Sequence, residues 1–516
     1  MTSALAADAL LSRMPGLAEA SASADVRAYG ASGNGQTKDT RAIQAAIDSA
    51  AASGRAVHFP RGNYLSGTLH LRDRTTLQID AGARLIASPD DDDFDRAETH
   101  GYDTFADEET SDQRFALLQG REVKQLRIVG SGSIDGNRWK REGPKPIALR
   151  GCRGIEIRDL TIANAGNYGV SLVGCEHVDI EGVTILNGYA DGIDPDSCRD
   201  VRIARCHIDT RDDALCLKAS LALGARGATE RVRVFGCHLA TRHNAIKLGT
   251  ESSGDFRDIV IRDCTIVGKR HPSPWKGDLT SGIALMSVDG GVLERVTVQN
   301  IRMASVRTPI FVRLARRGRG QRVPTAGALR HVSIKDVQVG AALGASSITG
   351  IPGAPIGPIT LQNLTVEVRG GGTRHASLQV PEKETRYPDG TMFADLPAYG
   401  LYCRHATGLV IEDANLGIDQ PDARPAVVLD DVSGVHVRRL HAVAPIEGGP
   451  MLWLHAVRDA ELRDLHPRAG STVARISGPT TAGIRLDGHE GPDAVVLDRD
   501  LSPTALQRSI GTSRQD

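Results

Sequence analysis

The chain has 516 residues, 40% of them apolar, and a formal net charge of -1. Near neutrality argues against a nucleic-acid-binding protein, which needs a concentrated positive surface, and no stretch approaches the roughly 18 apolar residues that cross a bilayer. Aromatic residues make up only 4% while glycine is frequent at 56, a composition that suits many short strands joined by tight turns.

The first 24 residues are expected to form either a plain N-terminal extension or the remnant of a secretion signal. Ala20-Ser21-Ala22 has the small residues of a signal cleavage site, but Asp8, Arg13 and Glu19 interrupt the apolar stretch that such a signal requires. Both interpretations stay open at this point, and we expect a secreted or periplasmic protein.

A helix is predicted just after this extension, in the segment that begins at Asp39. Thr40 and Arg41 follow, and apolar residues then recur at helical spacing as far as Ile47, which is the pattern of an amphipathic helix capped by Asp39. Because a solenoid needs a cover over its open end, we expect this helix to close the N-terminal end of the core.

From Gly151 onward a short pattern recurs in which four of eight positions are apolar. The copies are Ile155-Ile157-Leu160-Ile162, Val178-Ile180-Val183-Ile185, Val201-Ile203-Cys206-Ile208, Val232-Val234-Cys237-Leu239, Ile259-Ile261-Cys264-Ile266, Val332-Ile334-Val337-Val339 and Ile359-Leu361-Leu364-Val366, with looser copies around Leu409 and Val435. Each copy contains two strand-like alternations separated by one extra residue, which marks a bend. Early copies lie 23 residues apart, and such a repeat predicts a parallel β-helix whose stacked coils bury their apolar faces.

Cysteines repeat in register with this pattern. They form two sets, Cys152, Cys175 and Cys198, and Cys206, Cys237 and Cys264. Stacking at about 4.8 Å would place like side chains in a ladder. Since no CxxC pair occurs, we expect small buried thiols rather than a disulfide chain or a metal site.

The extent of the repeat sets the expected domain organisation. Residues 1–24 form the N-terminal extension, residues 25–470 the β-helix catalytic domain, and residues 471–516 a C-terminal extension or tail. The repeat fades from about Ser471, and Thr512 to Asp516 are expected to be a loose tail.

Polar residues recur six to eight positions after the central apolar residue of four consecutive repeats. They are Asn167, Tyr168, Asp191, Asp212, Asp213, His243 and Asn244. If the coils are in register, these side chains form one polar ladder, and carboxylates on adjacent rungs raise the pKa of at least one of them, which separates a proton donor from a base. A single aspartate here would most simply stabilise a turn, as we expect of Asp200, Asp258 and Asp263. The shared register, with Lys218 and Lys247 following in the same coils, favours a catalytic site.

Three segments of this ladder have a specific order and spacing, Ala190–Asp194, Asp212–Lys218 and Asn244–Glu251. They resemble motifs of the polygalacturonase family, glycoside hydrolase family 28, and the resemblance extends roughly from Asp25 to Leu440. It implies an all-β, single-stranded right-handed parallel β-helix of the pectin-lyase-like type. It also implies an inverting glycosidase that hydrolyses O-glycosyl bonds of a polysaccharide or oligosaccharide.

The resemblance assigns roles to three aspartates. Asp212 would protonate the departing glycosidic oxygen, while Asp191 and Asp213 would hold and deprotonate the attacking water. Inversion needs an acid and a base about 6.5–9.5 Å apart, which carboxylates offset by one rung and one residue can reach. Substrate contacts are expected from His243, Asn244, Lys247, Lys218, Asn167, Tyr168 and Glu251. No cofactor and no metal are implied, and the partner is a glycan, not a nucleic acid or a membrane.

The sequence departs from the family pattern at three places. Tyr189 stands in place of an asparagine, so a supporting amide is missing, and Asn244 stands where the family has its active-site histidine. Ala284 and Met286 replace the arginine and lysine that bind the galacturonate carboxylate. We therefore expect plain polygalacturonate to be a poor substrate, unless another cation substitutes. The candidates are Lys218, Lys247 and Arg313.

An insertion between Val380 and Arg404 breaks the repeat spacing. It contains Glu382, Lys383, Tyr387, Tyr399 and Tyr402. Long loops on a solenoid tend to gather on the binding face. The insertion is therefore either a closure of one end of the binding cleft, which would favour exo-action, or a plain structural loop.

Two other functions compete with hydrolysis. A polysaccharide lyase on the same fold would use Lys218 or Lys247 as its base, and a non-catalytic glycan-binding solenoid would use the aspartates to accept hydrogen bonds from sugar hydroxyls. The three aspartates in family order favour hydrolysis over both.

Overall fold

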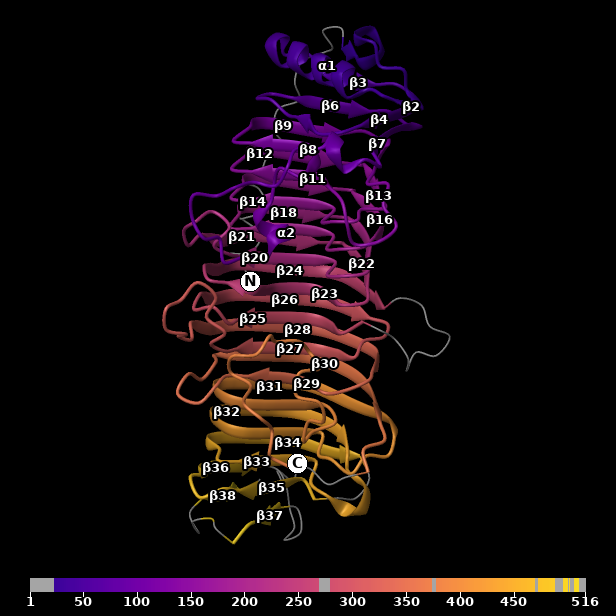
Figure 1. Ribbon diagram of the computed structural model, residues 1–516. Helices are drawn as coiled ribbons and strands as arrows, with labels where there is room; N and C mark the ends of the chain where they lie inside the picture. Colours follow the sequence, from indigo (N-terminus) through magenta and orange to yellow (C-terminus); the bar gives the residue numbers. More distant parts are fainter. Residues whose placement is uncertain are drawn as a thin grey trace, which may run out of the picture.

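Short parallel strands joined by bends wind the chain into a right-handed parallel β-helix (Figure 1). Successive coils pair residue by residue, so that Ile155 lies beside Val178, Val178 beside Val201, and Val201 beside Val232. All four side chains are buried. The predicted fold class and the register of the repeats are confirmed.

The computed structural model describes residues 23–268, 279–373, 377–468, 472–487, 495–499, 501 and 505–509. Residues 1–22 of the predicted N-terminal extension and the predicted tail Thr512–Asp516 lie outside the described residues. Within them, no helix is long and apolar enough to cross a membrane.

The coils build three faces of the β-helix. The first, which we call the site face, comprises β5 (Leu69–His70), β8 (Ala116–Arg121), β11 (Lys145–Arg150), β14 (Val170–Val173), β17 (Ile193–Asp196), β20 (Leu215–Ala219), β23 (Asn244–Ser252), β25 (Ser281–Ser287), β27 (Thr308–Leu314), β29 (Ser346–Thr349), β33 (Leu452–His455), β35 (Ala474–Ser477) and β37 (Val495–Leu497). The second comprises β1 (Ala24–Asp25), β3 (Val57–Phe59), β6 (Thr76–Ile79), β9 (Lys124–Val129), β12 (Arg153–Arg158), β15 (Glu176–Glu181), β18 (Arg199–Ala204) and β21 (Ala228–Phe235). The third comprises β2 (Asn34–Lys38), β4 (Gly62–Ser66), β7 (Ala83–Ala87), β10 (Ser133–Asp135), β13 (Thr161–Ala163), β16 (Thr184–Gly188), β19 (His207–Thr210) and β22 (His238–Thr241).

Later coils have longer strands that bend through more than one face. Through the second and third faces run β24 (Asp255–Gly268), β26 (Val292–Met303), β28 (Ala328–Ala342), β30 (Ile359–Gly370) and β34 (Arg458–Arg468), while β31 (Leu401–Gln420) and β32 (Val427–Val443) run through all three. The aspartates predicted to stabilise turns, Asp200, Asp258 and Asp263, have left-handed backbone (φ 56°, 57° and 57°), a conformation that aspartate tolerates better than most residues.

The helix α1 (Thr40–Ser53) covers the N-terminal end of the stack and buries an apolar face that includes Ile43, as predicted (Figure 1). Asp39 is the N-cap residue, as predicted, but its side chain makes no capping hydrogen bond to the helix. The Asp39 carboxylate instead accepts the backbone N–H groups of Ser32 (2.8 Å) and Gly33 (3.0 Å), and so fixes the preceding turn.

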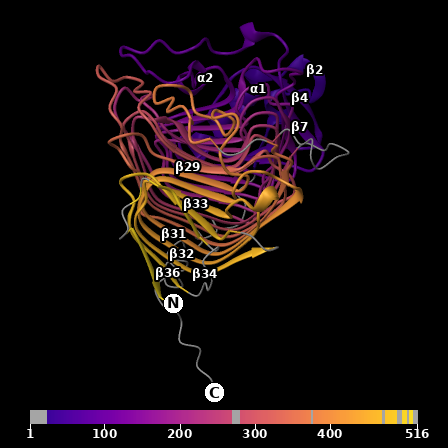
Figure 2. The ribbon, with the colours of Figure 1, turned by 90° about the horizontal axis from the view of Figure 1, so that it is seen from below.

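The region predicted as a C-terminal extension adds strands to the same stack within its described residues. β35 pairs with β33 and β37 with β35, while β36 (Ala482–Asp487) pairs with β34 and β38 (Leu506–Ser509) with β36. The predicted cysteine sets are buried free thiols, as expected. Seen from below, α2 (Glu108–Ser111) lies on the side of β29 and β33 and away from β34 and β36 (Figure 2).

Core and surface positions of one coil should differ sharply in their contribution to stability. Ile180 is fully buried, whereas Leu186 is 40% exposed. We expect Ile180→Ala to lower the free energy of unfolding by about 2–5 kcal/mol because it opens a cavity, and Leu186→Ala to change it by less than about 0.5 kcal/mol. Urea unfolding followed by circular dichroism measures both, and equal effects would contradict the described core.

Candidate active site

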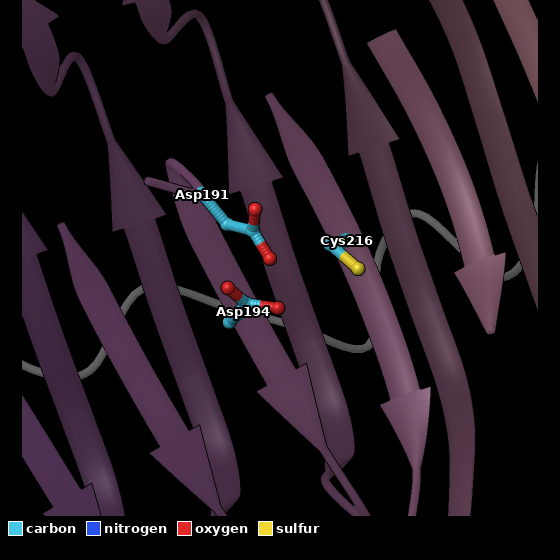
Figure 3. A group of neighbouring side chains, drawn as sticks. All are labelled: Asp191, Asp194 and Cys216. Atoms are coloured by element: carbon cyan, nitrogen blue, oxygen red, sulfur yellow. The ribbon is translucent and has the colours of Figure 1, made fainter. Parts of the chain in front are cut away.

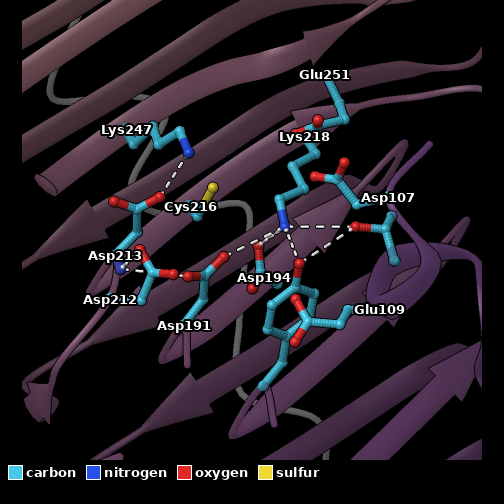
Figure 4. Close-up of polar contacts among 12 residues, drawn as sticks. Asp107, Glu109, Asp191, Asp194, Asp212, Asp213, Cys216, Lys218, Lys247 and Glu251 are labelled. Carbon is cyan, nitrogen blue, oxygen red and sulfur yellow. Dashed lines mark hydrogen bonds and ion pairs between the residues drawn. The ribbon is translucent and has the colours of Figure 1, made fainter. Parts of the chain in front are cut away.

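Four adjacent strands of the site face bring the predicted polar residues together (Figure 4). β14 pairs with β17, β17 with β20, and β20 with β23. Asp191 lies just before β17, Asp212 and Asp213 lie just before β20, and Asn244 begins β23. The aspartates are therefore neighbours in successive coils, because the repeats stack in register.

Asp213 is buried among donors from the next coil. Its Oδ1 accepts from the backbone N–H (3.0 Å) and the side-chain amide (2.7 Å) of Asn244, and its Oδ2 lies 2.6 Å from Lys247 Nζ. Burial alone would raise the pKa of Asp213, but Lys247 and Asn244 outweigh it and hold the pKa below its ordinary value. Asp213 is thus ionised at neutral pH, and Asn244 supplies an amide of the kind that Tyr189 lacks.

Asp191 and Asp194 form a second acidic group on the neighbouring coil (Figure 3). Both are buried, and an oxygen of each lies within 4.8 Å of the other and of Cys216 Sγ. Burial, reinforced by the charge of Asp194, raises the pKa of Asp191 well above its ordinary value, and burial raises that of Asp194 to about 6. As the pH falls, this pair therefore takes up a proton before Asp213 does.

Lys218 places a buried ammonium beside this pair. Its Nζ lies 3.3 Å from Asp191 Oδ2 and 3.0 Å from Asp194 Oδ1, and donates to the Tyr168 hydroxyl at 2.9 Å. Burial alone would lower the pKa of Lys218, but Asp194 and its neighbours raise it well above the ordinary value. A metal ion bound by Asp191, Asp194 and Cys216 would have to displace this ammonium, so the lysine itself serves as the local cation.

Asp212 differs from the other two aspartates because it faces outward. Its side chain is 21% exposed, its Oδ2 accepts from Arg141, and its Oδ1 accepts the N–H of Asp213 at 3.0 Å. Arg141 is held in turn by Glu109 of α2, at 2.9 and 2.5 Å. His243 is 60% exposed, with Nδ1 3.8 Å from Asp212. An arginine and a histidine thus flank the most accessible of these carboxylates.

Glu251 completes the charge balance under the site. It is buried and lies 2.8 Å from Arg319, which also binds Asp107 at 2.8 Å. Burial alone would raise the pKa of Glu251, but Lys218 and Lys247 lower it to about 2. Its carboxylate therefore offsets the positive charge of Lys218 and Lys247. Together with Asp107 it binds Arg319, and so connects the loop that contains Arg319 to the segment before α2.

The remaining predicted residues have structural partners. The Asn167 amide donates to the carbonyl of Gly143 (3.3 Å) and so fixes the loop that carries Arg141. Tyr168 is buried against Lys218. Arg313, a candidate substitute cation, is buried. It donates to Thr349 (3.1 Å) and to the carbonyls of Gly350 and Glu382, so its guanidinium binds groups of the protein itself and does not face a substrate.

Ala284 and Met286 lie in an apolar cluster that continues the site face beyond Lys247. Ala284 is the direct neighbour of Lys247 on β25. The insertion cluster, as we call it, consists of Ala284, Met286, Phe311, Ala345, Val380, Met392, Phe393, Leu396, Ala398, Tyr402, Val428 and Trp453. Side chains of the insertion thus cover the two positions where the family has its cations, which explains why both are apolar here.

Sequence reasoning missed three residues of this site. Strand alternation alone would place Asp191 and Asp194, three residues apart, on opposite faces, but Asp191 lies before β17 and the chain brings the two carboxylates together. Glu109 comes from the short helix α2 and Arg141 from a loop, where no periodicity predicts a spatial neighbour.

Two family models match the chain. The model described as Glycosyl hydrolases family 28 matches residues 93–351, which include the three aspartates and both lysines. The model described as Rhamnogalacturonase A/epimerase, pectate lyase-like, matches residues 23–95. A probable polygalacturonase of Vitis vinifera is 26% identical in an alignment of 381 positions that covers 67% of this chain and 74% of that protein. An exo-poly-alpha-D-galacturonosidase of Dickeya chrysanthemi is 36% identical in an alignment of 127 positions that covers 23% of this chain and 20% of that protein.

Solved structures resemble the chain in fold. The family 28 exopolygalacturonase of Yersinia enterocolitica superposes with a TM-score of 0.61 at 18% identity, covering 80% of this chain and 78% of that one. A hyperthermoactive exopolygalacturonase of Thermotoga maritima superposes with a TM-score of 0.53 at 18% identity, covering 69% and 89%. At this identity the likeness shows the fold alone.

The raised pKa of Asp194 should appear in the pH dependence of stability. A carboxyl whose pKa rises on folding stabilises the folded state at low pH, and this stabilisation is lost as the pH rises from about 4 to about 6. The free energy of unfolding of Asp194→Asn minus that of the parent protein should therefore be about 1–3 kcal/mol larger at pH 7 than at pH 4.

Urea titrations at the two pH values measure this gain. Asp200→Asn is the matched control, because Arg231 lowers the pKa of Asp200 and its effect falls below this pH range. An Asp194→Asn difference that does not change with pH would show that the carboxyl is not perturbed as described.

Proposed function

Because the chain belongs to the glycosyl hydrolases of family 28, we propose that Asp191, Asp212 and Asp213 hydrolyse the glycosidic bond of a polysaccharide or oligosaccharide with inversion. The chain is a glycosidase that acts on O-glycosyl bonds, and its substrate is a glycan. One observation carries the assignment of roles, the different surroundings of the three carboxylates: Lys247 and Asn244 bind Asp213 and lower its pKa, burial beside Asp194 raises the pKa of Asp191, and Asp212 faces outward.

Asp213 is the base in this proposal. Lys247 and Asn244 keep its carboxylate ionised, so it can take a proton from a water molecule bound between Asp213 and Asp191. The oxygen of that water attacks the anomeric carbon. Asp191, which Lys218 holds in place, orients the water from the adjacent coil.

Asp212 is the acid that protonates the departing oxygen. Arg141 occupies the outward-facing oxygen of Asp212, so Asp212 has to release Arg141 before it can reach the departing oxygen. An inverting mechanism needs about 6.5–9.5 Å between acid and base, whereas an oxygen of Asp212 and one of Asp213 lie within 4.8 Å here. We therefore propose that substrate enters between Arg141 and Asp212 and turns Asp212 outward, as the partial exposure of this side chain allows.

The electrostatics do not favour the lyase alternative. Lys218 and Lys247 would be its bases, but neighbouring carboxylates raise the pKa of each lysine well above its ordinary value. A lysine held in its charged form cannot accept a proton.

Plain polygalacturonate is a poor substrate in this proposal. The two cation positions of the family are the apolar, buried Ala284 and Met286. Five cations near the aspartates have a carboxylate partner: Lys247 with Asp213, Lys218 with Asp194, Arg141 with Glu109, Arg317 with Asp289 and Arg319 with Glu251. A uronate carboxylate would have to compete with these internal pairs.

A secreted or periplasmic location completes the proposal, since polysaccharides accumulate outside the cytoplasm. Its test is the recovery of activity from the culture medium or the periplasmic fraction of the producing cell.

Replacing Asp213 or Asp191 with asparagine should abolish water activation. We expect kcat to fall by about 10²–10⁴-fold, the usual contribution of a general base, with an unchanged far-ultraviolet circular dichroism spectrum. Asp263→Asn, at an exposed turn of the same β-helix, is the control and should retain activity. Near-full turnover in both site variants, on a glycan that the parent protein cleaves, would refute the assignment.

Substrate preference tests whether the absence of the cation pair weakens the cleavage of polygalacturonate. Each lost charged hydrogen bond costs about 1.5–3 kcal/mol, so kcat/KM on polygalacturonate should lie about two to four orders of magnitude below that on the best neutral or mixed glycan of a plant and microbial panel. A reducing-sugar assay measures both values. Polygalacturonate as the best substrate of the panel would contradict this part of the proposal.

A further inference from the structure

The insertion is anchored firmly to the site face. Besides its apolar contacts in the insertion cluster, it receives a hydrogen bond from Thr308 Oγ1 to the carbonyl of Gly390 at 2.8 Å. Glu382 lies 2.8 Å from Arg404 and 3.1 Å from His405. These contacts fix the position of the segment between residues 382 and 390 relative to β27 and β31.

Tyr387 lies in this fixed segment, close to the strand that carries Lys247. Its ring centroid is 5.8 Å from the guanidinium carbon of Arg317, which donates to the carbonyl of Thr250 (3.0 Å), three residues beyond Lys247 on β23. Burial raises the pKa of Tyr387, while Lys247 lowers it and Asp213 raises it. The hydroxyl therefore stays protonated beside the proposed base.

Tyr387 is nevertheless 54% exposed. Its contact with Arg317 therefore leaves about half of this large aromatic residue open to solvent. The apolar C–H face of a sugar stacks on such a ring, and the phenol hydroxyl at its edge remains available for a hydrogen bond. Stacking of this kind requires no charge on the sugar.

We propose that Tyr387 is the stacking platform for a sugar residue without a carboxylate, bound in the subsite next to the bond that is cleaved. The inference rests on the proposed function, because Asp213 defines where that subsite lies. The insertion then acts twice: it covers positions 284 and 286, where charge recognition would occur, and it supplies an aromatic surface beside them.

Binding is measured by isothermal titration calorimetry on full-length protein carrying Asp212→Asn, which prevents turnover and leaves the contacts of Asp213 intact. The probes are arabino-, galacto-, xylo- and rhamnose-containing neutral oligosaccharides, with trigalacturonate as the acidic comparison.

Tyr387→Ala should weaken the binding of the best neutral probe about ten- to thirtyfold, in the range for loss of a buried aromatic contact. Tyr387→Phe should bind within about threefold of the parent, since the ring is retained. Thr385→Ala, on the same turn and exposed, is the matched control and should bind normally.

Two results would overturn the inference: no neutral probe binds, or the best one binds Tyr387→Ala as tightly as the parent protein. Turnover of the same probes by protein with an intact Asp212 tests the proposed function separately. Tyr387-dependent binding without turnover would refute the catalytic proposal and leave the platform standing. Turnover that is unchanged in Tyr387→Ala would refute the stacking role of Tyr387 and support the catalytic proposal. In the active enzyme a stacking role further predicts a raised KM with kcat nearly unchanged in Tyr387→Ala, because the contact is the same in ground and transition states.

Discussion

In-register stacking of the coils is the constraint on which the rest of this structure depends. Neighbouring strands lie about 4.8 Å apart, so acidic residues at matching positions must share a small volume. Such a cluster would repel itself unless cations were built in, and Lys218 and Lys247 lie 3.0 Å from Asp194 and 2.6 Å from Asp213. Both ammonium groups favour the ionised carboxylates, but the outcomes differ: Lys247 and Asn244 outweigh burial and lower the pKa of Asp213, whereas burial outweighs Lys218 and raises the pKa of Asp191 and Asp194.

Much of this arrangement could be predicted from the sequence, for a physical reason. A repeat that buries one face has one register, so an offset along the chain becomes a neighbour in space, and Asp191, Asp213 and Asn244 could be placed together from their spacing alone. The same logic fails between repeats. Arg141 reaches Asp212 from a loop, and the Asp39 carboxylate binds a turn rather than its helix, because such contacts depend on the path of the loops and have no period.

Specificity follows from what covers the site face beyond Lys247. The sequence lacks the family's cation pair. In the structure, Ala284 and Met286 at these positions are buried in a cluster with side chains of the insertion. Charged groups there would be buried without partners, at high cost. Ala284, Met286 and the insertion are therefore one structural feature. Tyr387 belongs to the same insertion and lies close to the strand that carries Lys247.

The stereochemistry of the product shows whether the glycosidic bond is cleaved by a single displacement, with water activated at Asp213. Proton nuclear magnetic resonance during the first minutes of cleavage of the best glycan substrate reports the configuration of the newly formed anomeric centre before it equilibrates. We expect inversion, with Asp212 turned away from Asp213 when substrate is bound. Retention would contradict it, because the close approach of Asp212 and Asp213 (oxygens within 4.8 Å) would then be the working geometry of a nucleophile and its acid–base partner.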